Sequence, residues 1–256
     1  MSIPAQATPQ TRTPTSPMRK TALAAGILYL ITFVSIPTLT LYKPVHDHVG
    51  TFILGGGSTT GVLWGALSEV VVGLAGIGTA VVLYPVTRRV SRTAALGLVT
   101  ARVLETSLIF VGVISLLSII TLRTDVAGTA GADPASLVTA GHTLVAVYDR
   151  TFGLSQGLMP VACDLLLGYV LYRSGLVPRI LPIIAFVGAP LLLASDVAVF
   201  FGVIDRVSSF TGVATIPVAA FELSLGVYLT FKGFRPAPII TGATPTAAPR
   251  PAVPVG

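Results

Sequence analysis

The chain has 256 residues, of which 53% are hydrophobic and only 10% are charged. A soluble domain carries about 25% charged residues, so this composition excludes an ordinary water-soluble globule and predicts a multi-pass membrane protein. The single cysteine, Cys163, excludes an intramolecular disulfide, a redox pair of cysteines and a cysteine-rich zinc site.

Proline-rich segments lie at both ends of the chain. Residues 1–20 contain four prolines and residues 235–256 contain six, which predicts two disordered tails around a transmembrane domain at 21–234. Arg19 and Lys20 precede an apolar run that is too long for a signal peptide and has no small-residue cleavage site. We therefore expect a retained first membrane helix, and Met18 is an alternative start of the protein.

Six apolar runs are long enough to cross about 30 Å of hydrocarbon, for which about 20 helical residues suffice. In chain order they are residues 22–41, 61–86, 94–122, 151–172, 180–204 and 210–231. The third run is the longest and is expected to tilt or protrude. The predicted fold is therefore all-α, an integral membrane bundle of six transmembrane helices.

Basic residues in the connections predict the orientation of the bundle. One side and both tails contain Arg12, Arg19, Lys20, Arg88, Arg89, Arg92, Arg173, Arg179, Lys232, Arg235 and Arg250, and the other side has only Lys43, Arg123 and Arg206. Because cytoplasmic loops are enriched in Lys and Arg, we expect both termini to be cytoplasmic and the protein to lie in the cell inner membrane. This topology explains the net charge of +6 without a nucleic-acid partner; the expected partner is the lipid bilayer.

The connections on the outer side contain two further features. A partly amphipathic pattern at residues 135–150 predicts an interfacial helix that leads into the fourth span. His46, Asp47 and His48 lie in the first outer connection. A metal site needs at least one further ligand nearby, so we interpret these three as solvated loop residues and predict no metal site.

Ionisable residues within the spans are the main candidates for a functional site, because each costs about 2.5–3.5 kcal/mol at a helix centre. They are Glu69, Arg102, Glu105, Asp164, Asp196 and Glu222. Arg102 and Glu105 are three residues apart on one helix face and are expected to pair. The rise per residue places Arg102, Glu105, Asp164 and Glu222 on the cytoplasmic side of the membrane centre. The same count places Glu69 and Asp196 in a second layer on the outer side.

One arginine cannot neutralise five carboxylates, so acids that face the bundle interior must be protonated, bound to a cation or in contact with water. Two interpretations remain open. In the first, these residues form a polar cavity that binds, and in a transporter also carries, a small molecule, lipid or ion. In the second, neutral carboxyl groups join the helices of a non-catalytic structural or accessory membrane protein. Neither interpretation requires a cofactor or a catalytic residue.

A serine motif supplies a third hypothesis, an intramembrane hydrolase. Gly153-Leu154-Ser155-Gln156-Gly157 matches the GxSxG pattern and lies on the fourth of six spans, as in rhomboid-type proteases. The resemblance also requires a histidine on the sixth span, which has none. His142 is about 20 Å away along a continuous helix, so the motif is expected to be a coincidence.

Five segments carry a resemblance to a known family. They are AGILYLIT (25–32), GTAVVLYPVTRR (78–89), ARVLETSLIFVGVISLL (101–117), LLLGYVLYRSGLVPR (165–179) and FELSLGVYLTFKGFRP (221–236). Together they resemble the domain of unknown function 4386 family of bacterial membrane proteins. The resemblance implies a multi-pass fold and the importance of the matching positions Arg102, Glu105 and Glu222, and it implies no reaction. Residues 148–157 depart from the family pattern, in which a tryptophan near Arg150 and no serine motif are expected.

Overall fold

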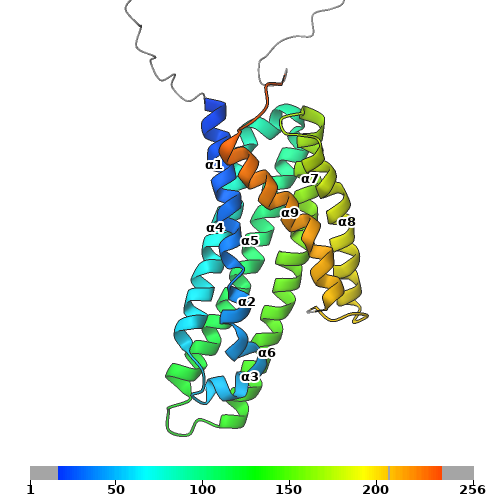
Figure 1. The fold of residues 1–256 in the computed structure, drawn as a ribbon. Coiled ribbons are helices and arrows are strands. Elements are labelled where there is room, and N and C mark those ends of the chain that lie inside the picture. Colours follow the sequence, from blue (N-terminus) through cyan, green and yellow to red (C-terminus); the bar gives the residue numbers. More distant parts are fainter. Residues whose placement is uncertain (1–16, 207, 238–256) are drawn as a thin grey trace, which may run out of the picture.

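The structure, a computed structural model, describes residues 17–206 and 208–237, and every regular element in these ranges is a helix (Figure 1). The all-α prediction is confirmed. Most of the two predicted tails lies outside the described residues. Helical structure begins at Pro17, before the predicted boundary at residue 21. At the other end, the backbone N–H of Arg235 donates to the Leu176 carbonyl over 2.7 Å, so the chain still contacts the bundle beyond residue 234.

Six helical stretches of the described chain are long and apolar enough to cross a membrane, as predicted. They are Pro17–Val34, Thr59–Val90, Arg92–Val126, Pro134–Ser174, Ile180–Phe200 and Ser209–Phe231. The individual elements are α1 (Pro17–Ile31), η1 (Thr32–Ser35), α2 (Thr38–Leu41), α3 (Lys43–Ile53), α4 (Thr59–Val90), α5 (Arg92–Thr121), η2 (Leu122–Val126), α6 (Pro134–Phe152), η3 (Gly153–Leu158), α7 (Met159–Ser174), α8 (Ile180–Phe200) and α9 (Ser209–Phe231).

The first span is shorter than the predicted run of residues 22–41. The α-helix ends at Ile31, and the chain continues through the 3-10 turn η1 to Pro37, which has no backbone N–H to continue a helical hydrogen-bond ladder. The Thr32 hydroxyl donates to the Tyr29 carbonyl over 2.6 Å within the last turn. The predicted outer loop then folds as α3, whose buried residues pack in one cluster with Leu116 and Tyr148.

The fourth span, rather than the third, is the longest. The elements α6, η3 and α7 follow one another without a break over 41 residues, which is about 60 Å at 1.5 Å per residue. The predicted helix at 135–150 that leads into the fourth span is confirmed as α6, and it packs along α5; its location at the membrane interface stays a prediction. Figure 1 shows α3 and α6 extending beyond the connection between α8 and α9. A continuous helix of this length exceeds the hydrocarbon thickness of about 30 Å.

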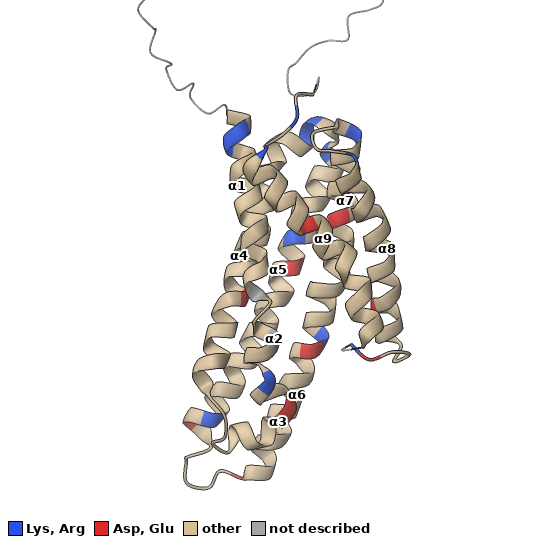
Figure 2. Ribbon diagram, in the orientation of Figure 1, with Lys and Arg blue, Asp and Glu red and all other residues tan. Residues whose placement is uncertain are grey.

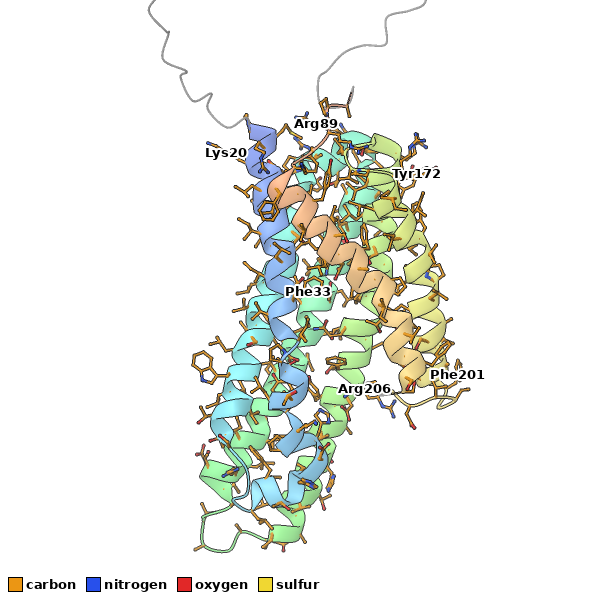
Figure 3. All side chains as sticks on the ribbon, viewed as in Figure 1. Lys20, Phe33, Arg89, Tyr172, Phe201 and Arg206 are labelled. Carbon is orange, nitrogen blue, oxygen red and sulfur yellow. The ribbon has the colours of Figure 1, made fainter. Side chains whose placement is uncertain are left out.

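Both described chain ends lie at the same end of the bundle (Figure 1). Lys and Arg gather there, and a separate group of charged residues lies in the middle of the bundle (Figure 2). Lys20, Arg89 and Tyr172 mark this end, which we call the basic end, and Phe201 and Arg206 mark the opposite end of α8 and α9 (Figure 3).

Two apolar clusters stabilise the bundle at different levels. The first joins α1, α4, α5, α7, α8 and α9 near the basic end and includes Leu83, Leu98, Leu167 and Leu229. The second lies around α3 and includes Phe52 and Ile119. Many apolar side chains on the outside, such as Trp64 on α4, are exposed, which fits a surface that contacts lipid chains. The charged residues in the middle of the bundle therefore lie between these two apolar clusters.

Candidate functional site

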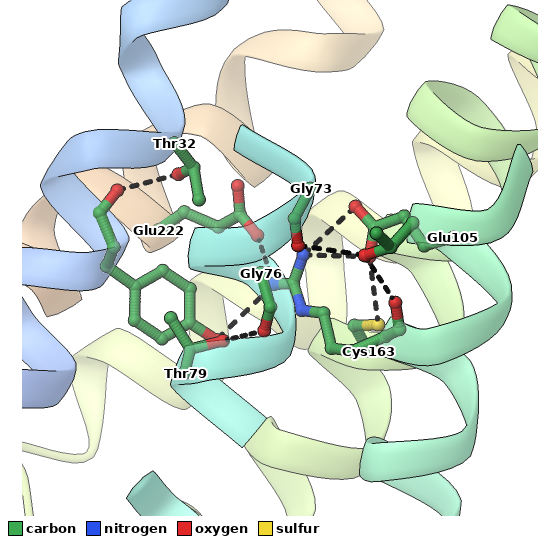
Figure 4. A network of polar contacts seen from close by, with 10 residues as sticks. Thr32, Gly73, Gly76, Thr79, Glu105, Cys163 and Glu222 are labelled. Carbon is green, nitrogen blue, oxygen red and sulfur yellow. Dashed lines mark hydrogen bonds and ion pairs between the residues drawn. The ribbon is translucent and has the colours of Figure 1, made fainter. Parts of the chain in front are cut away.

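A charged cluster joins three spans in the middle of the bundle (Figure 4). The Arg102 guanidinium donates from NH1 to Oε1 and Oε2 of Glu105 over 3.0 and 2.9 Å. Its NH2 group donates to Glu222 Oε1 over 2.9 Å and to the Tyr29 hydroxyl over 3.4 Å. We call Tyr29, Arg102, Glu105 and Glu222 the Arg102 cluster. The predicted pairing of Arg102 with Glu105 is confirmed, and Arg102 is only 3% exposed.

Small residues on α4 allow the polar face of α5 to approach. A Cβ atom on Gly76 would lie 3.8 Å from Cδ of Arg102, and the Thr106 hydroxyl donates to the Gly73 carbonyl over 2.9 Å. From α7, the Cys163 thiol donates to Glu105 Oε2 over 3.7 Å. The Arg102 side chain is thus held between helices that glycine brings close together.

Asp164 lies beside the cluster without a hydrogen bond to it. Its side chain is fully buried, and neither carboxylate oxygen has a hydrogen-bond partner in the described part of the chain. A buried carboxyl group without hydrogen-bond donors is costly in its ionised form.

The two acids of the predicted second layer, Glu69 and Asp196, lie in different surroundings. Glu69 on α4 accepts a hydrogen bond from the Tyr148 hydroxyl over 2.9 Å. Asp196 on α8 has an Oδ2 atom without a hydrogen-bond partner among the described residues. Gly157 of η3 faces it closely, because a Cβ atom there would lie 2.8 Å from this oxygen.

One cavity of about 550 Å³ connects both layers. Arg102, Glu105, Glu222, Glu69 and Asp196 all line it, and Asp164 does not. Its apolar lining includes Phe33, Ile36, Val72, Ile109, Leu192 and Val218, and hydroxyl groups of Ser208, Thr211 and Thr215 line it toward the start of α9. The structure therefore brings the predicted polar residues, Asp164 excepted, around a shared space.

Arg206, in the connection between α8 and α9, is a lining residue that the sequence did not indicate. Its NH1 group lies 3.1 Å from Asp149 Oδ1, and its guanidinium carbon lies 4.8 Å from the Phe152 ring centroid. Through these contacts the α8–α9 connection packs against α6. Sequence spacing contained no signal for them, because only helix packing brings residues so far apart in the chain together.

The prediction of solvated loop residues at positions 46–48 is wrong in part. All three residues lie in the helix α3, where Asp47 and His48 are exposed and His46 is half-buried. The Nδ1 atom of His46 lies 3.6 Å from Asp149 Oδ1, and its ring lies 5.3 Å from the Tyr148 ring. Burial lowers the pKa of His46; Arg206 acts in the same direction, and Asp149 and Asp47 oppose it. No group of three metal-ligating side chains occurs in the described ranges.

Ser155 lies in η3, the π-helical part of the fourth span. Its side chain is buried, and its hydroxyl donates to the Phe152 carbonyl of its own helix over 3.4 Å. Among the described residues no imidazole bonds to it, and the sixth span, α9, contains no histidine. The geometry lacks the base that a serine nucleophile requires.

We predict that Ser155→Ala leaves the protein folded, because the hydrogen bond of the Ser155 hydroxyl is made within its own helix. The yield and melting temperature of the purified protein in detergent test this, with a loss of stability of no more than about 1 kcal/mol expected. A larger loss would contradict the prediction, and covalent labelling of Ser155 by a fluorophosphonate would instead support the hydrolase hypothesis.

Comparison with known proteins agrees with the family resemblance. The family model described as Domain of unknown function (DUF4386) matches residues 24–233. Neither the curated proteins nor the solved structures that were compared with the chain gave a match. The match includes all six spans except the first residues of α1. The chain, a helical multi-pass membrane protein, belongs to the DUF4386 family.

Proposed function

We propose that the protein binds a small molecule, lipid or ion in this cavity and transports it across the cell inner membrane. The observation that carries the proposal is the cavity of about 550 Å³ in the bundle, with Arg102, Glu105 and Glu222 in its lining. Protein interiors are normally close-packed, and ligand pockets span about 300–1,000 Å³. Intramembrane ionisable residues around such a space are typical of substrate and ion pathways.

The two sides of the Arg102 cluster differ in a way that supports transport. Toward the basic end, buried side chains such as Leu83, Leu98 and Leu225 fill the bundle. Toward the opposite end, the cavity reaches Arg206 and Ser208 in the α8–α9 connection. A central site that is closed toward one side and reachable from the other is the arrangement that alternating access requires.

The acids that outnumber the bases in the cavity lining could couple ligand binding to protonation. Glu69 and Asp196 line the cavity and form no ion pair with a basic residue of the described chain, and Arg102 is shared by Glu105 and Glu222. Carboxyl groups in such positions take up and release protons in pumps and transporters. Binding of the ligand and protonation of these acids would then be linked.

The proposal predicts that water reaches the cavity from the side opposite the termini. In a Cys163→Ala background, Thr215→Cys places a thiol in the lining of the cavity. A membrane-impermeant methanethiosulfonate reagent added to the outside of intact cells is expected to label it at least about tenfold faster than Ile216→Cys. Ile216 is the neighbouring position, 61% exposed on the lipid-facing surface of α9, where thiolate does not form readily in hydrocarbon.

The control for folding is the elution profile of each variant in size-exclusion chromatography. Equal labelling rates at positions 215 and 216, or no labelling at 215 in well-folded protein, would contradict an accessible cavity. That result would favour the structural or accessory role instead.

A further inference from the structure

We propose that the ligand is an amphiphile with a positively charged amino head group, which enters the cavity from the lipid phase between η1 and α9. This proposal rests on the proposed function and specifies its substrate class. It is carried by the charges that line the cavity, by their unsatisfied groups and by the elements that contribute to its lining.

Acids outnumber bases in the cavity. The bases of its lining are Arg102 and Arg206, and the acids are Glu69, Glu105, Asp196 and Glu222. Both bases already form ion pairs, Arg102 with two carboxylates and Arg206 with Asp149, while Arg102 Nε and Arg206 Nη1 have no hydrogen-bond partner among the described residues. Four acids against two paired bases leave an excess of acidic groups in the lining, so charge complementarity favours a cationic head group.

Two of the acids lack a cationic partner in the described chain. Glu69 is only 3% exposed and accepts a hydrogen bond from the neutral Tyr148 hydroxyl. Asp196 presents a buried Oδ2 atom without any donor. Buried carboxylates need hydrogen-bond donors or a counter-charge. An ammonium group supplies up to three donors and one positive charge, and both acids line the space that it would occupy.

The proposed entry lies between η1 and α9, because both elements contribute residues to the lining of the cavity. Phe33 and Ile36 line it from one edge, and Thr211, Thr215 and Ala219 line it from the other. Figure 1 shows α1 and α9 side by side near the basic end and diverging toward the opposite end. In the packing, α9 lies against α1 and α8, whereas η1 lies against α4 and α1.

An exposed apolar side chain lies at this edge of the cavity. Ile36 lines the cavity and is 61% exposed, which on a membrane protein marks a surface in contact with lipid chains. A ligand that enters here keeps its alkyl chain among apolar groups while its head group reaches Glu69 and Asp196. An amphiphile would contact both the apolar lining and the acidic residues, whereas a small hydrophilic cation would contact only the acidic residues.

The test measures binding to the full-length protein in nanodiscs of neutral phosphatidylcholine. The probe is an alkylamine with a dansyl group at the end of its chain, and its fluorescence is compared with that in empty nanodiscs. We expect saturable binding that dodecylamine displaces and that sodium dodecyl sulfate at the same sub-micellar concentration displaces at least about tenfold less effectively.

Two pairs of variants locate the site. Gly212 lines the cavity and a Cβ atom there would meet nothing within 4 Å, so the backbone leaves room for a side chain at this position and Gly212→Trp places a bulky group in the lining. It should weaken probe binding at least about tenfold, and Val213→Trp, at a neighbouring position 65% exposed that is not in the lining, should not change it. Glu69→Gln with Asp196→Asn should weaken binding similarly, whereas Asp205→Asn, outside the lining, should not.

The possible outcomes separate this inference from the proposed function. Labelling of Thr215→Cys together with preferred binding of the dodecyl sulfate would overturn the amine head group and leave the cavity as a binding site. Amine binding that Gly212→Trp does not affect would overturn entry between η1 and α9. Failure of the Thr215→Cys labelling in folded protein would overturn the proposed function itself.

Discussion

Arg102→Met is expected to lower the free energy of unfolding by about 3–5 kcal/mol, the loss that follows when one partner of a buried ion pair is removed. Arg102 is the donor to both Glu105 and Glu222, and its removal leaves two carboxyl groups without a counter-charge between packed helices. Unfolding of the purified protein by sodium dodecyl sulfate in mixed micelles, followed by circular dichroism, measures the change.

A triple variant separates the charge effect from lost packing. Arg102→Met combined with Glu105→Gln and Glu222→Gln removes the uncompensated charges, and neutral replacements of a buried ion cluster are often tolerated. We expect it to regain most of the stability that the single variant loses. Arg150→Met, at an exposed arginine of α6, serves as the matched control and should change stability by less than about 0.5 kcal/mol. If Arg102→Met is as stable as the control, the cluster does not hold α5 and α9 together.

Gly26→Ile is expected to separate α1 from α9 and to cost about 1–3 kcal/mol of stability or more. A Cβ atom at position 26 would lie 2.6 Å from the Thr230 backbone nitrogen and 2.7 Å from the Gly226 carbonyl oxygen. These are backbone atoms and cannot turn away, so the two helices must move apart. The melting temperature in detergent and the yield of monodisperse protein test the prediction.

The control for this change is the same substitution where α9 leaves space. Gly212→Ile has the same difference in helix propensity, but no atom lies within 4 Å of the new Cβ position. It should therefore melt close to the wild-type protein. Equal melting temperatures for the two variants would show that α1 and α9 do not depend on a close contact at Gly26.

Local features of the fold were predictable from residue order. Apolar length determines where a helix can satisfy its backbone within hydrocarbon, so all six spans were found from sequence. The pairing of Arg102 with Glu105 was equally predictable, because a spacing of three residues on one helix fixes their proximity. The ends of the spans were not predictable from sequence where the chain departs from a regular α-helix, as at Pro37 and in η3.

Relations between helices required the tertiary structure. Glu222 lies 120 residues after Arg102 in the chain, and no periodicity indicates which side of α9 faces α5. The ion pair of Arg206 with Asp149 and the position of His46 depend in the same way on how α3, α6 and the α8–α9 connection pack.

Composition and order by themselves determined that this protein is a membrane bundle with costly charges in its interior, because hydrophobic length and local spacing act within single helices. Only the tertiary structure decided that Glu69, Arg102, Glu105, Asp196 and Glu222 share one cavity while Asp164 lies outside it. The physical reason is that helix rotation and crossing, set by close contacts such as that of Gly26 with Gly226, determine which side chains meet and where space remains between them.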